Sequence, residues 1–450
     1  MGDVIISKYG GSSITSHTDI ERIKRITYDN PRRKIIVVSA PGKRDNDDVK
    51  VTDMLIKLAR TKDSDLFDRI LNRYKIVFPD ENLEDITAML DRRLNQNLEG
   101  KNDADRESPY KDGIAAFGEE ACARLLAKYL GAEYVDSREL FMVTNDFGNA
   151  IILPCSEKMI TKRLNKTNSL YVVPGFYGCT ENGLTAIFGR NKSDLTGAYV
   201  AYSLDAMLYE IFSDKEGVLA SDPDIVKDPV KIDKITFEEM RDLAYSGFNI
   251  FHPEAMGPVA KKKIPVHIRE TAKYPAEGTY VVHERVSDLN KPIVGIAYQN
   301  GFCAFNIWAF GLNDRVGIAY DILGIFKERN ISMEFMPGVI DDISVVLKRN
   351  QLKNHSIENI IAEIHSLNDE GIEINFQDNL GCIVVAGIGL KNRNVSSANI
   401  QRTIESSGVD IEFISRGSKK RCIVYGVNHS DGRKAVNAVY NKYIRSKTHV

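Results

Sequence analysis

Three short polar stretches of the sequence carry residue types suited to phosphate or carboxylate chemistry. The first, KYGGSS at residues 8–13, directly follows an apolar run at residues 4–6. Gly10 and Gly11 allow close backbone approach to a ligand, and the start of a following helix attracts anions. Lys8 would place a fixed cation at the end of the preceding strand. A plain glycine turn explains the stretch equally well, because neither a Walker motif nor GxGxxG is present.

The second stretch, residues 172–197, contains two glycine turns separated by a short hairpin around residues 181–183. Arg190, after the second turn, has a planar side chain that binds a carboxylate through two hydrogen bonds. Asp194 precedes a predicted helix over residues 195–204, where it could orient lysines around a phosphoryl group. The alternatives are a surface ion pair for Arg190 and a helix N-cap for Asp194.

The third stretch, residues 211–224, places Ser213 and Asp214 at the carboxyl end of a predicted strand. Open α/β sheets bind their ligands at this edge. Two Asx turns around Gly217 and Pro223 are the structural alternative. His252 is interpreted as structural, and no set of histidine, cysteine and acidic residues has the spacing of a metal site.

Strands and helices that would position these stretches alternate along the first half of the chain. Continuous apolar runs predict strands buried on both faces, and intervening helices predict parallel pairing with right-handed crossovers. The fold class is therefore α/β, with a mostly parallel sheet between helices. The strands are expected near residues 4–6, 35–38, 170–173, 208–212 and 265–268, and helices at 20–26, within 45–110 and at 119–130.

After a break near residues 285–292 the sequence repeats itself with an offset of 78 residues. Gly311 corresponds to Gly389 and Ile322 to Ile400, and the correspondence continues without slippage for more than a hundred residues. Each copy has the order strand, turn, helix, strand, strand, helix. This order predicts two small ferredoxin-like α+β modules in tandem.

Composition restricts the class of protein further. A chain of 450 residues is long enough for about two to four domains. The net charge of -2 gives no field for nucleic acid or an anionic membrane, and no apolar window is long enough to span a bilayer. The six cysteines lack paired spacing and the N-terminus lacks a signal peptide, so we expect a reduced, cytoplasmic protein.

Taken in order, the motifs resemble those of the aspartate kinase (aspartokinase) family of the amino acid kinase superfamily. The motifs are KYGGSS, VVSAPGK, FGEE, VVPGFYG, FGRNKSDLT, FSDKEGVLASDPD and FHPEA, and the two repeats resemble the tandem ACT domains of that family. The resemblance runs from about residue 2 to residue 446. It implies a catalytic domain over residues 1–290 and ACT-like repeats over 291–378 and 379–450. No fused dehydrogenase module is expected, so the form would be monofunctional.

The resemblance implies ATP-dependent phosphorylation of the side-chain carboxylate of L-aspartate to 4-phospho-L-aspartate, the entry to lysine, threonine and methionine synthesis. Lys8 and Asp194 would be catalytic, and ATP would carry Mg²⁺ with little help from protein ligands. The substrate would contact Ser39, Thr52, Glu119, Phe176, Arg190 and Ser193. The nucleotide would contact Lys8, Gly10, Gly11, Ser12, Ser213, Asp214, Leu219 and Asp222.

The resemblance also implies feedback inhibition by an end-product amino acid bound between subunits. The effector pocket would comprise Gly317, Ile318, Ala319, Ser332, Met333, Glu334, Asp341, Asp342 and Ile343. Acidic Glu334 and Asp342 favour a cationic effector, so L-lysine is the first expectation and L-threonine the second. Both carboxylates also suit a plain exposed strand edge. Pairing of sheet edges predicts a homodimer or a dimer of dimers.

Some positions depart from the usual family pattern. Asn191 and Lys192 replace a pair of glycines, Asp224 replaces an arginine and Asn249 replaces a lysine. These departures leave open a non-catalytic amino-acid sensor with a degenerate kinase domain. A glutamate or acetylglutamate kinase is the rival within the superfamily, and the paired repeats argue against it.

Overall fold

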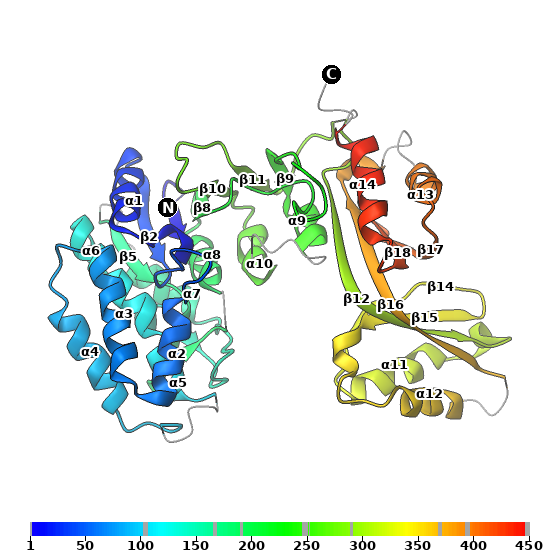
Figure 1. Ribbon diagram of the computed structural model, residues 1–450, viewed down its shortest axis with the longest axis horizontal. Coiled ribbons are helices and arrows are strands. Elements are labelled where there is room, and N and C mark those ends of the chain that lie inside the picture. Colours follow the sequence, from blue (N-terminus) through cyan, green and yellow to red (C-terminus); the bar gives the residue numbers. More distant parts are fainter. Residues whose placement is uncertain are drawn as a thin grey trace. The chain divides into compact units, whose positions relative to one another are not determined.

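The computed structural model describes residues 2–101, 107–164, 169–189, 192–244, 251, 253–288, 291–367, 371–391 and 397–445 (Figure 1). Two compact units make up the chain. The first comprises Met1–Val218, Lys231–Phe237 and Asn249–Arg285, and the second comprises Leu219–Val230, Glu238–Phe248 and Val286–Val450.

An eight-stranded sheet forms the centre of the first unit, with the strand order β3-β5-β2-β1-β8-β10-β11-β9. All neighbouring strands are parallel except β10 and β11, which confirms the predicted mostly parallel sheet. The strands are β1 (Ile5–Tyr9), β2 (Arg33–Val38), β3 (Glu133–Tyr134), β5 (Tyr171–Pro174), β8 (Leu208–Ser213), β9 (Lys234–Thr236), β10 (Val266–Glu270) and β11 (Thr279–Val282).

Helices cover both faces of this sheet, as an α/β fold requires (Figure 1). Tyr9 and Phe212 point to one face, where they join a buried core with side chains of α1 (His17–Asp29), α2 (Val51–Thr61), α3 (Ser64–Val77), α4 (Glu84–Asn95) and α6 (Phe117–Leu130). Lys8 and Tyr209 alternate to the other face, against α8 (Ser193–Ser203). The expected strands and helices of this half are thus present.

A small second sheet precedes α8 in the chain. It contains β4 (Met142–Val143), β6 (Tyr177–Thr180) and β7 (Thr185–Ile187), and β6 and β7 form the predicted antiparallel hairpin around residues 181–183. The remaining helices of the first unit are α5 (Pro109–Ala115), α7 (Ser156–Arg163) and α10 (Pro253–Lys261). Helix α9 (Phe237–Ala244) begins at the last residue of a first-unit segment, and its other residues belong to the second unit.

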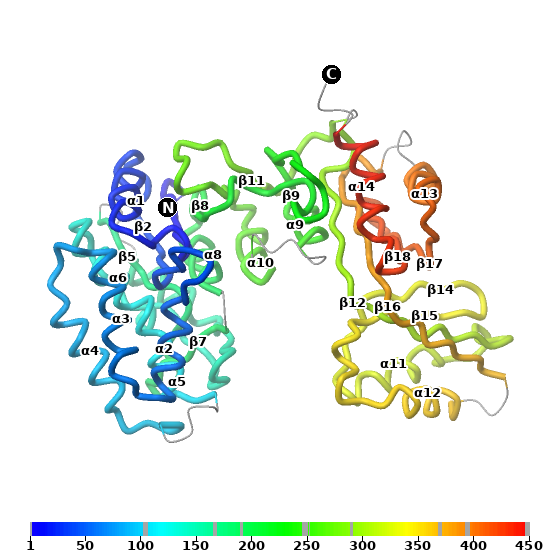
Figure 2. The backbone as a smooth tube through the Cα atoms, viewed as in Figure 1, coloured from blue at the N-terminus to red at the C-terminus, as the bar shows by residue number. Residues whose placement is uncertain are grey.

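Two long antiparallel strands, β12 (Gly295–Trp308) and β16 (Glu373–Ala386), run side by side through the second unit (Figure 2). The other strands are β13 (Met333–Phe335), β14 (Gly338–Val339), β15 (Asp342–Lys348), β17 (Ile411–Arg416) and β18 (Cys422–Asn428). The helices are α11 (Ile318–Glu328), α12 (Ile357–Ser366), α13 (Ser397–Ser406) and α14 (Gly432–Tyr443). The strand order is β13-β15-β12-β16-β18-β17.

The pairing of β12 with β16 has the symmetry of the sequence repeat. Phe302 pairs with Leu380, which is its own equivalent 78 residues later. Gly295 pairs with Ala386 at one end of the ladder, and the equivalents of these residues, Glu373 and Trp308, pair at the other end. A local two-fold axis therefore passes between the two strands at Phe302. The predicted pair of ferredoxin-like modules is confirmed.

Each long strand serves both modules. The first module uses the second half of β12 and the first half of β16, with α11, β13, β15 and α12. The second module uses the second half of β16 with α13, β17, β18 and α14, and residues 295–300 of β12 pair with β16 as its fourth strand. The strand that completes the second module thus precedes the first module in the sequence.

Candidate functional site

Lys8 and Asp194 form an ion pair at the carboxyl edge of the large sheet. Lys8 Nζ lies 2.6 Å from Asp194 Oδ1, and both residues are more than nine-tenths buried. Asp194 is the second residue of α8, and Lys192 takes the N-cap position without a capping side chain. The N-cap interpretation of Asp194 is therefore wrong, and the helix begins two residues earlier than predicted. Lys8 and the N-terminal amides of α8 make this corner attractive to an anion.

The KYGGSS turn is held close to the loops that follow β2 and β8. The Gly10 amide donates to Phe212 O at 3.0 Å, and the Gly42 amide donates to Gly11 O at 2.9 Å. A Cβ atom on Gly11 would lie 2.8 Å from Ala40 O, so a side chain there would displace the β2 loop. Ser12 Oγ donates to Asp214 Oδ1 at 3.0 Å. Three strand ends thus converge around Lys8, as expected for parallel strands.

Ser39, Phe176 and Ser193 lie together on the side of this corner next to β5. Ser39 Oγ and Ser193 Oγ are 2.8 Å apart, which joins the end of β2 to the start of α8. A Cβ atom on Gly175 would lie 2.7 Å from Ser193 Cβ, so glycine is required for this close approach. Phe176 is buried with a φ of 84°. Its amide donates to the Thr196 hydroxyl of α8 at 3.0 Å.

Glu119 is a buried carboxylate in the first turn of α6. This turn packs closely on the residue after Ser39, since a Cβ atom on Gly118 would lie 2.8 Å from Ala40 Cβ. Burial raises the pKa of the Glu119 carboxyl to about 8, against smaller opposing effects from an Ala40 backbone hydrogen bond and the Lys8 charge. Its Oε2 atom has no hydrogen-bond partner within the described part of the chain. Such an atom requires a polar or cationic partner to be buried at low cost.

The neighbouring residue, Glu120, fixes the orientation of α6. Its buried carboxylate binds Arg93 of α4, Arg124 one turn along α6 and Arg138 after β3. This cluster turns Glu120 toward the peripheral helices, so that Glu119 points toward the sheet. The cluster as a whole could not be predicted from the sequence, because Arg93 lies 27 positions before Glu120 and Arg138 lies 18 positions after it.

Two further contacts at the sheet were also missed. Ser13 Oγ lies 2.6 Å from Thr271 Oγ1, and these residues are 258 positions apart in the chain. Arg33 and Glu210 form a buried bidentate ion pair with N–O distances of 2.6 and 2.9 Å. Burial raises the pKa of the Glu210 carboxyl, but the hydrogen bond and charge of Arg33 outweigh this effect, so the pKa is lowered.

Other predicted site residues have more ordinary surroundings. Thr52 is half-buried at the second position of α2. Asp222 Oδ1 accepts from the Asp224 amide at 2.9 Å, which confirms the alternative Asx turn at Pro223. Ser213 Oγ accepts from the Lys215 amide at 3.1 Å, which is a serine turn that ends before Gly217. Leu219 and Asp222 belong to the second unit.

Arg190 and Asn191 of the second glycine turn lie outside the described residues, as do Asn249 and His252 farther along the chain. Lys192 lies inside them, and its Nζ binds Glu254 at 2.8 Å and Asn149 Oδ1 at 3.1 Å. Its charge is therefore engaged by neighbours within the first unit.

The predicted effector residues all belong to the first module. Gly317, with a φ of 90°, starts α11, and buried Ile318 and half-buried Ala319 follow it. Ser332 exchanges two hydrogen bonds with the Gln351 side chain, and Met333 and Glu334 lie on β13. Asp341 accepts from the Asn313 amide at 3.4 Å, and Asp342 and Ile343 begin β15.

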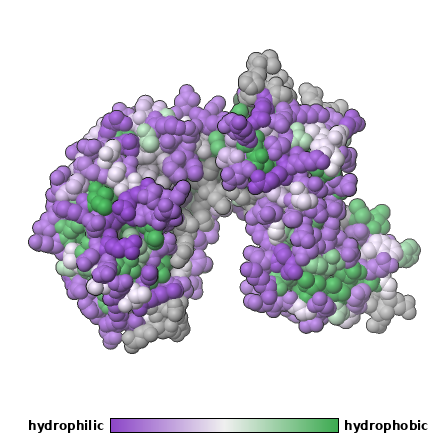
Figure 3. Space-filling model, in the orientation of Figure 1, coloured by the Kyte–Doolittle hydropathy of each residue, from purple (hydrophilic) through white to green (hydrophobic). Residues whose placement is uncertain are grey.

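An exposed apolar surface surrounds these positions of the first module (Figure 3). Its residues are Trp308, Phe310, Val316, Tyr320, Met336, Val339 and Ile340, whose exposed fractions run from 43% for Trp308 to at least 74% for Phe310, Val316, Tyr320, Val339 and Ile340. A contiguous surface of this kind usually marks an interaction site.

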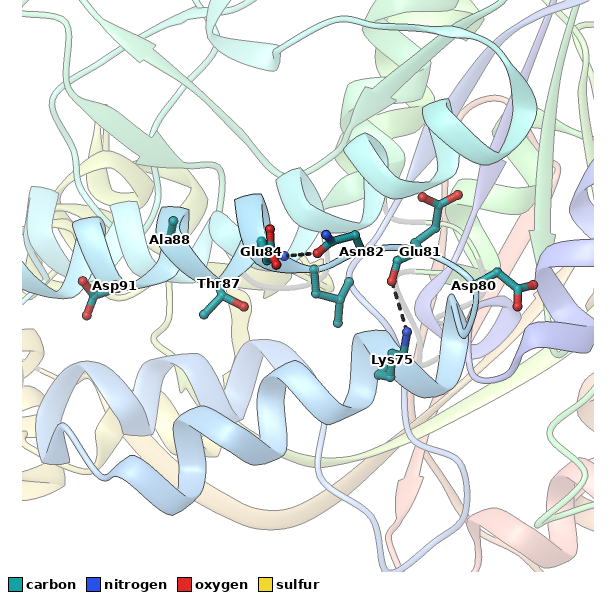
Figure 4. A pocket seen from close by; sticks show the side chains of 9 residues that line it. Lys75, Asp80, Glu81, Asn82, Glu84, Thr87, Ala88 and Asp91 are labelled. Atoms are coloured by element: carbon teal, nitrogen blue, oxygen red, sulfur yellow. Dashed lines mark hydrogen bonds between the residues drawn. The ribbon is translucent and has the colours of Figure 1, made fainter.

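A separate surface pocket of about 860 Å³ lies between α3 and α4 (Figure 4). Lys75, Asp80, Glu81, Asn82, Leu83, Glu84, Thr87, Ala88 and Asp91 line it. Its polar groups partly satisfy one another, since Lys75 Nζ donates to Glu81 O at 3.2 Å and the Glu84 amide donates to Asn82 Oδ1 at 2.8 Å. No residue of the Lys8 corner contributes to this pocket.

Metal-ligating side chains do not form a cage among the residues that the structure describes. In the described ranges no three histidine, cysteine or acidic residues come together as metal ligands. The same ranges contain no helix that is long and apolar enough to cross a bilayer.

Comparison with known proteins identifies the family. The model of the amino acid kinase family matches residues 3–270, and an ACT domain model matches residues 383–443. Aspartokinase 3 of Bacillus subtilis is 34% identical over 97% of this chain and 98% of its own. The chain belongs to the aspartokinase family. It is therefore an aspartate kinase with an appended ACT regulatory region.

Solved structures agree with this assignment. The aspartate kinase of Clostridium acetobutylicum has a TM-score of 0.85 and 31% identity, covering 98% of this chain and all of that one. Escherichia coli aspartokinase III, in complex with aspartate and ADP, has a TM-score of 0.77 at 20% identity, covering 97% of this chain and 99% of its own, so it supports the fold alone. The aspartokinase fold thus extends over nearly the whole chain.

Proposed function

We propose that this aspartokinase transfers the γ-phosphoryl group of ATP to the side-chain carboxylate of L-aspartate at the corner around Lys8. The observation that carries the proposal is the buried Lys8–Asp194 pair beside Glu119, whose Oε2 lacks a partner in the described part of the protein. The α-ammonium group of aspartate is a chemically matched partner for Glu119. The E. coli relative, which was solved with aspartate and ADP, supports these two ligands.

The transfer needs alignment and charge neutralisation rather than a general base. A carboxylate nucleophile is ionised at neutral pH, and the transferring group carries its charge on oxygen atoms. Lys8 would stabilise this charge, with the amides of Gly10, Gly11 and the first turn of α8 around the phosphates. Asp194 would hold the Lys8 ammonium in place. Ser12, Ser213, Asp214, Leu219 and Asp222 are proposed for the nucleotide.

For the substrate we propose that Glu119 binds the α-ammonium group and Arg190 binds the α-carboxylate. Ser39, Thr52, Phe176 and Ser193 would enclose the reacting carboxylate. The hydroxyl pair of Ser39 and Ser193 lies beside the Lys8 corner, where it can donate to an incoming oxygen.

Mg²⁺ would be held mainly by ATP phosphates and water. Asp194 is buried and paired with Lys8 at 2.6 Å, whereas Asp214 is exposed, accepts from Ser12 and among the described residues has only exposed Lys215 as an ionic partner, at 3.4 Å. Asp214 is thus the better-suited carboxylate to approach a nucleotide-bound cation. Mg²⁺ would neutralise phosphate charge when bound.

Regulation is proposed to act through the first module. L-lysine is the first candidate effector and L-threonine the second, because Glu334 and Asp342 offer carboxylates to a cationic side chain. E. coli aspartokinase III was also solved with lysine and aspartate, which supports lysine. The pocket would comprise the nine residues named above, from Gly317 to Ile343.

Assembly as a homodimer, or a dimer of dimers, is proposed through the same module. The exposed apolar surface around Trp308, Phe310 and Tyr320 is suited to self-association, because its burial against a second copy would remove it from water. Replacing Phe310 by glutamate should shift the mass measured by light scattering toward the monomer. An unchanged mass would place the contact elsewhere.

The proposed domain boundaries remain residues 1–290 for catalysis and 291–378 and 379–450 for the two regulatory repeats. The proposed setting is the cytoplasm, and the proposed pathway is the branch toward lysine, threonine and methionine.

The decisive experiment is an acyl-phosphate assay. ATP-dependent product is trapped with hydroxylamine, with L-aspartate compared with L-glutamate and N-acetylglutamate, and with lysine or threonine added. We expect turnover with aspartate and inhibition by lysine. Turnover with glutamate alone would assign a different kinase, and binding of amino acids without turnover would favour a sensor.

A further inference from the structure

Asp112 is a fully buried carboxylate that the proposed chemistry does not use. It lies on α5, and its Oδ2 atom accepts two backbone hydrogen bonds, from Gly148 N at 2.9 Å and from Ile187 N at 3.0 Å. Its Oδ1 atom is buried without a hydrogen-bond partner among the described residues. Burial raises the pKa of the Asp112 carboxyl to about 7, against the opposing effect of the two amides. Such an unfavourable group requires an explanation.

One of the two amides, Ile187 N, lies on the strand that leads into the second glycine turn, and the other, Gly148 N, lies in a loop that contacts Lys192. Ile187 ends β7, two residues before Gly189, whose φ is 96°. Ile187 O accepts from Ala150 N at 2.8 Å, so Asp112 and Ala150 hold the two sides of one peptide segment. Gly148 precedes Asn149, whose Oδ1 accepts from Lys192 Nζ. One carboxylate oxygen therefore binds both the strand that ends before Gly189 and the loop that contacts Lys192.

The other end of α5 leads directly to Glu119. The Ala116 amide donates to Asp112 O at 2.9 Å, and Ala116 is the residue from which α6 begins. Glu119 follows three residues later, in the first turn of α6. Asp112 is thus bonded through its backbone to the start of α6, which carries Glu119. Its side chain is bonded to the strand before Gly189 and to the loop whose Asn149 contacts Lys192.

We infer that Asp112 is a positioning residue, which holds the start of α6, the strand that ends before Gly189 and the loop that contacts Lys192 in a fixed relation, and so shapes the amino-acid subsite. The inference rests on the proposed function, in which Glu119 and Arg190, the residue after Gly189 in the sequence, bind aspartate. A carboxylate suits this task because an acceptor with negative charge strengthens both hydrogen bonds from the amides. The two segments are also joined directly, by the hydrogen bond from Ala150 N to Ile187 O at 2.8 Å, and Asp112 adds the link from this pair to α5.

Three variants of the full chain test the inference. Asp112→Ala leaves two buried amides without an acceptor, and we expect the KM for aspartate to rise about tenfold with the KM for ATP unchanged. Asp112→Asn retains an oxygen that accepts both amides, so it should restore the KM for aspartate to within about threefold of the wild type. Asp112→Glu moves the oxygen by one methylene and should raise the KM for aspartate while the protein folds.

A readout that does not depend on turnover separates this inference from the proposed function. Hydrogen exchange of peptides covering residues 145–151 and 184–189 should accelerate in Asp112→Ala and stay protected in Asp112→Asn. Glu210→Gln, which perturbs another buried carboxylate, serves as the control for general destabilisation and should leave both KM values in place. Unchanged exchange in both peptides, or equal rises in both KM values, would overturn the positioning role. If Asp112→Ala does not fold, an unchanged KM for aspartate in Asp112→Glu overturns it. Wild-type protein inactive on aspartate would instead refute the proposed function, and the exchange result would still decide on Asp112.

Discussion

Replacing Glu119 by glutamine should change how the stability of the first unit depends on pH. Burial raises the pKa of this carboxyl from 4.5 to about 8 in the folded chain. A raised pKa means that the folded state retains its proton between pH 4.5 and pH 8, where the unfolded state has lost it. The contribution of the Glu119 carboxyl to the free energy of unfolding is therefore fully present below pH 4.5 and is lost as the pH rises toward 8.

The magnitude follows from the proton difference. One proton bound only in the folded state lowers the free energy of unfolding by about 1.4 kcal/mol for each unit by which the pH rises. Between pH 5 and pH 7 the wild type should lose about 3 kcal/mol relative to Glu119→Gln, because glutamine does not titrate. All other groups titrate equally in both proteins, so the difference between the two curves isolates Glu119.

The assay must follow the first unit alone. The one tryptophan, Trp308, belongs to the second unit, so intrinsic fluorescence would report the wrong part of the chain. Urea unfolding at pH 5, 6 and 7 should instead be followed by hydrogen exchange of peptides from β1 and α6. Two compact units need not unfold together, which makes a local readout necessary.

The control and the contradicting outcome are both well defined. Glu84→Gln, on the exposed surface of α4, removes a carboxylate without removing a buried group and should keep the wild-type slope. Parallel slopes for the wild type and Glu119→Gln would show that Glu119 is ionised in the free enzyme, and the reasoning from burial would then be wrong.

Three further predictions concern the same unit. Lys8→Met should lower kcat about a thousandfold without unfolding the protein, measured by hydroxamate formation with Lys8→Arg as the charge-retaining control. Arg33→Met should cost about 3–5 kcal/mol in urea unfolding, because it removes the bidentate partner of buried Glu210 and leaves Ser7 at 2.9 Å and Arg269 at 3.3 Å as its partners in the described part of the chain. Adding Glu210→Met should recover part of this loss, and equal or additive losses would contradict the pairing. Gly175→Ala should cost about 1–3 kcal/mol and lower turnover, because its Cβ would lie 2.7 Å from Ser193 Cβ; wild-type kinetics would show that α8 tolerates the shift.

Sequence reasoning succeeded where a signal is local in the chain. The apolar run before Lys8 and the helical spacing of Ile20, Ile23 and Ile26 predict elements that the structure contains. The carboxyl-edge rule then brings Lys8 and Ser39 to one corner, because parallel strands end on the same side. The start of α8 was placed two residues late, since Ser193 and Asp194 were interpreted as preceding the helix although both lie within its first turn.

Contacts that depend on long-range packing could not be predicted. Arg124 holds Glu120 from one turn along α6, a spacing that the sequence does show, but Arg93 of α4 and Arg138 after β3 have no spacing that marks them as partners. The pairing of Ser13 with Thr271 joins two single hydroxyl residues across 258 positions. The same limit applies to Asp112, whose backbone partners have no side-chain signature.

The regulatory region shows a different limit, because its repeat was detected but its connectivity was not. An offset of 78 residues identifies equivalent positions, and it cannot show which copy each half of a long strand completes. Residues 295–300 lie within the first proposed repeat, 291–378, yet they pair with the half of β16 that belongs to the second module. A one-residue slip between β12 and β16 would turn the side chains of both modules to the wrong face at once. The ladder is irregular on both sides of Phe302, so the residues around this pair set the register of each half of the two strands, and with it the core of each module.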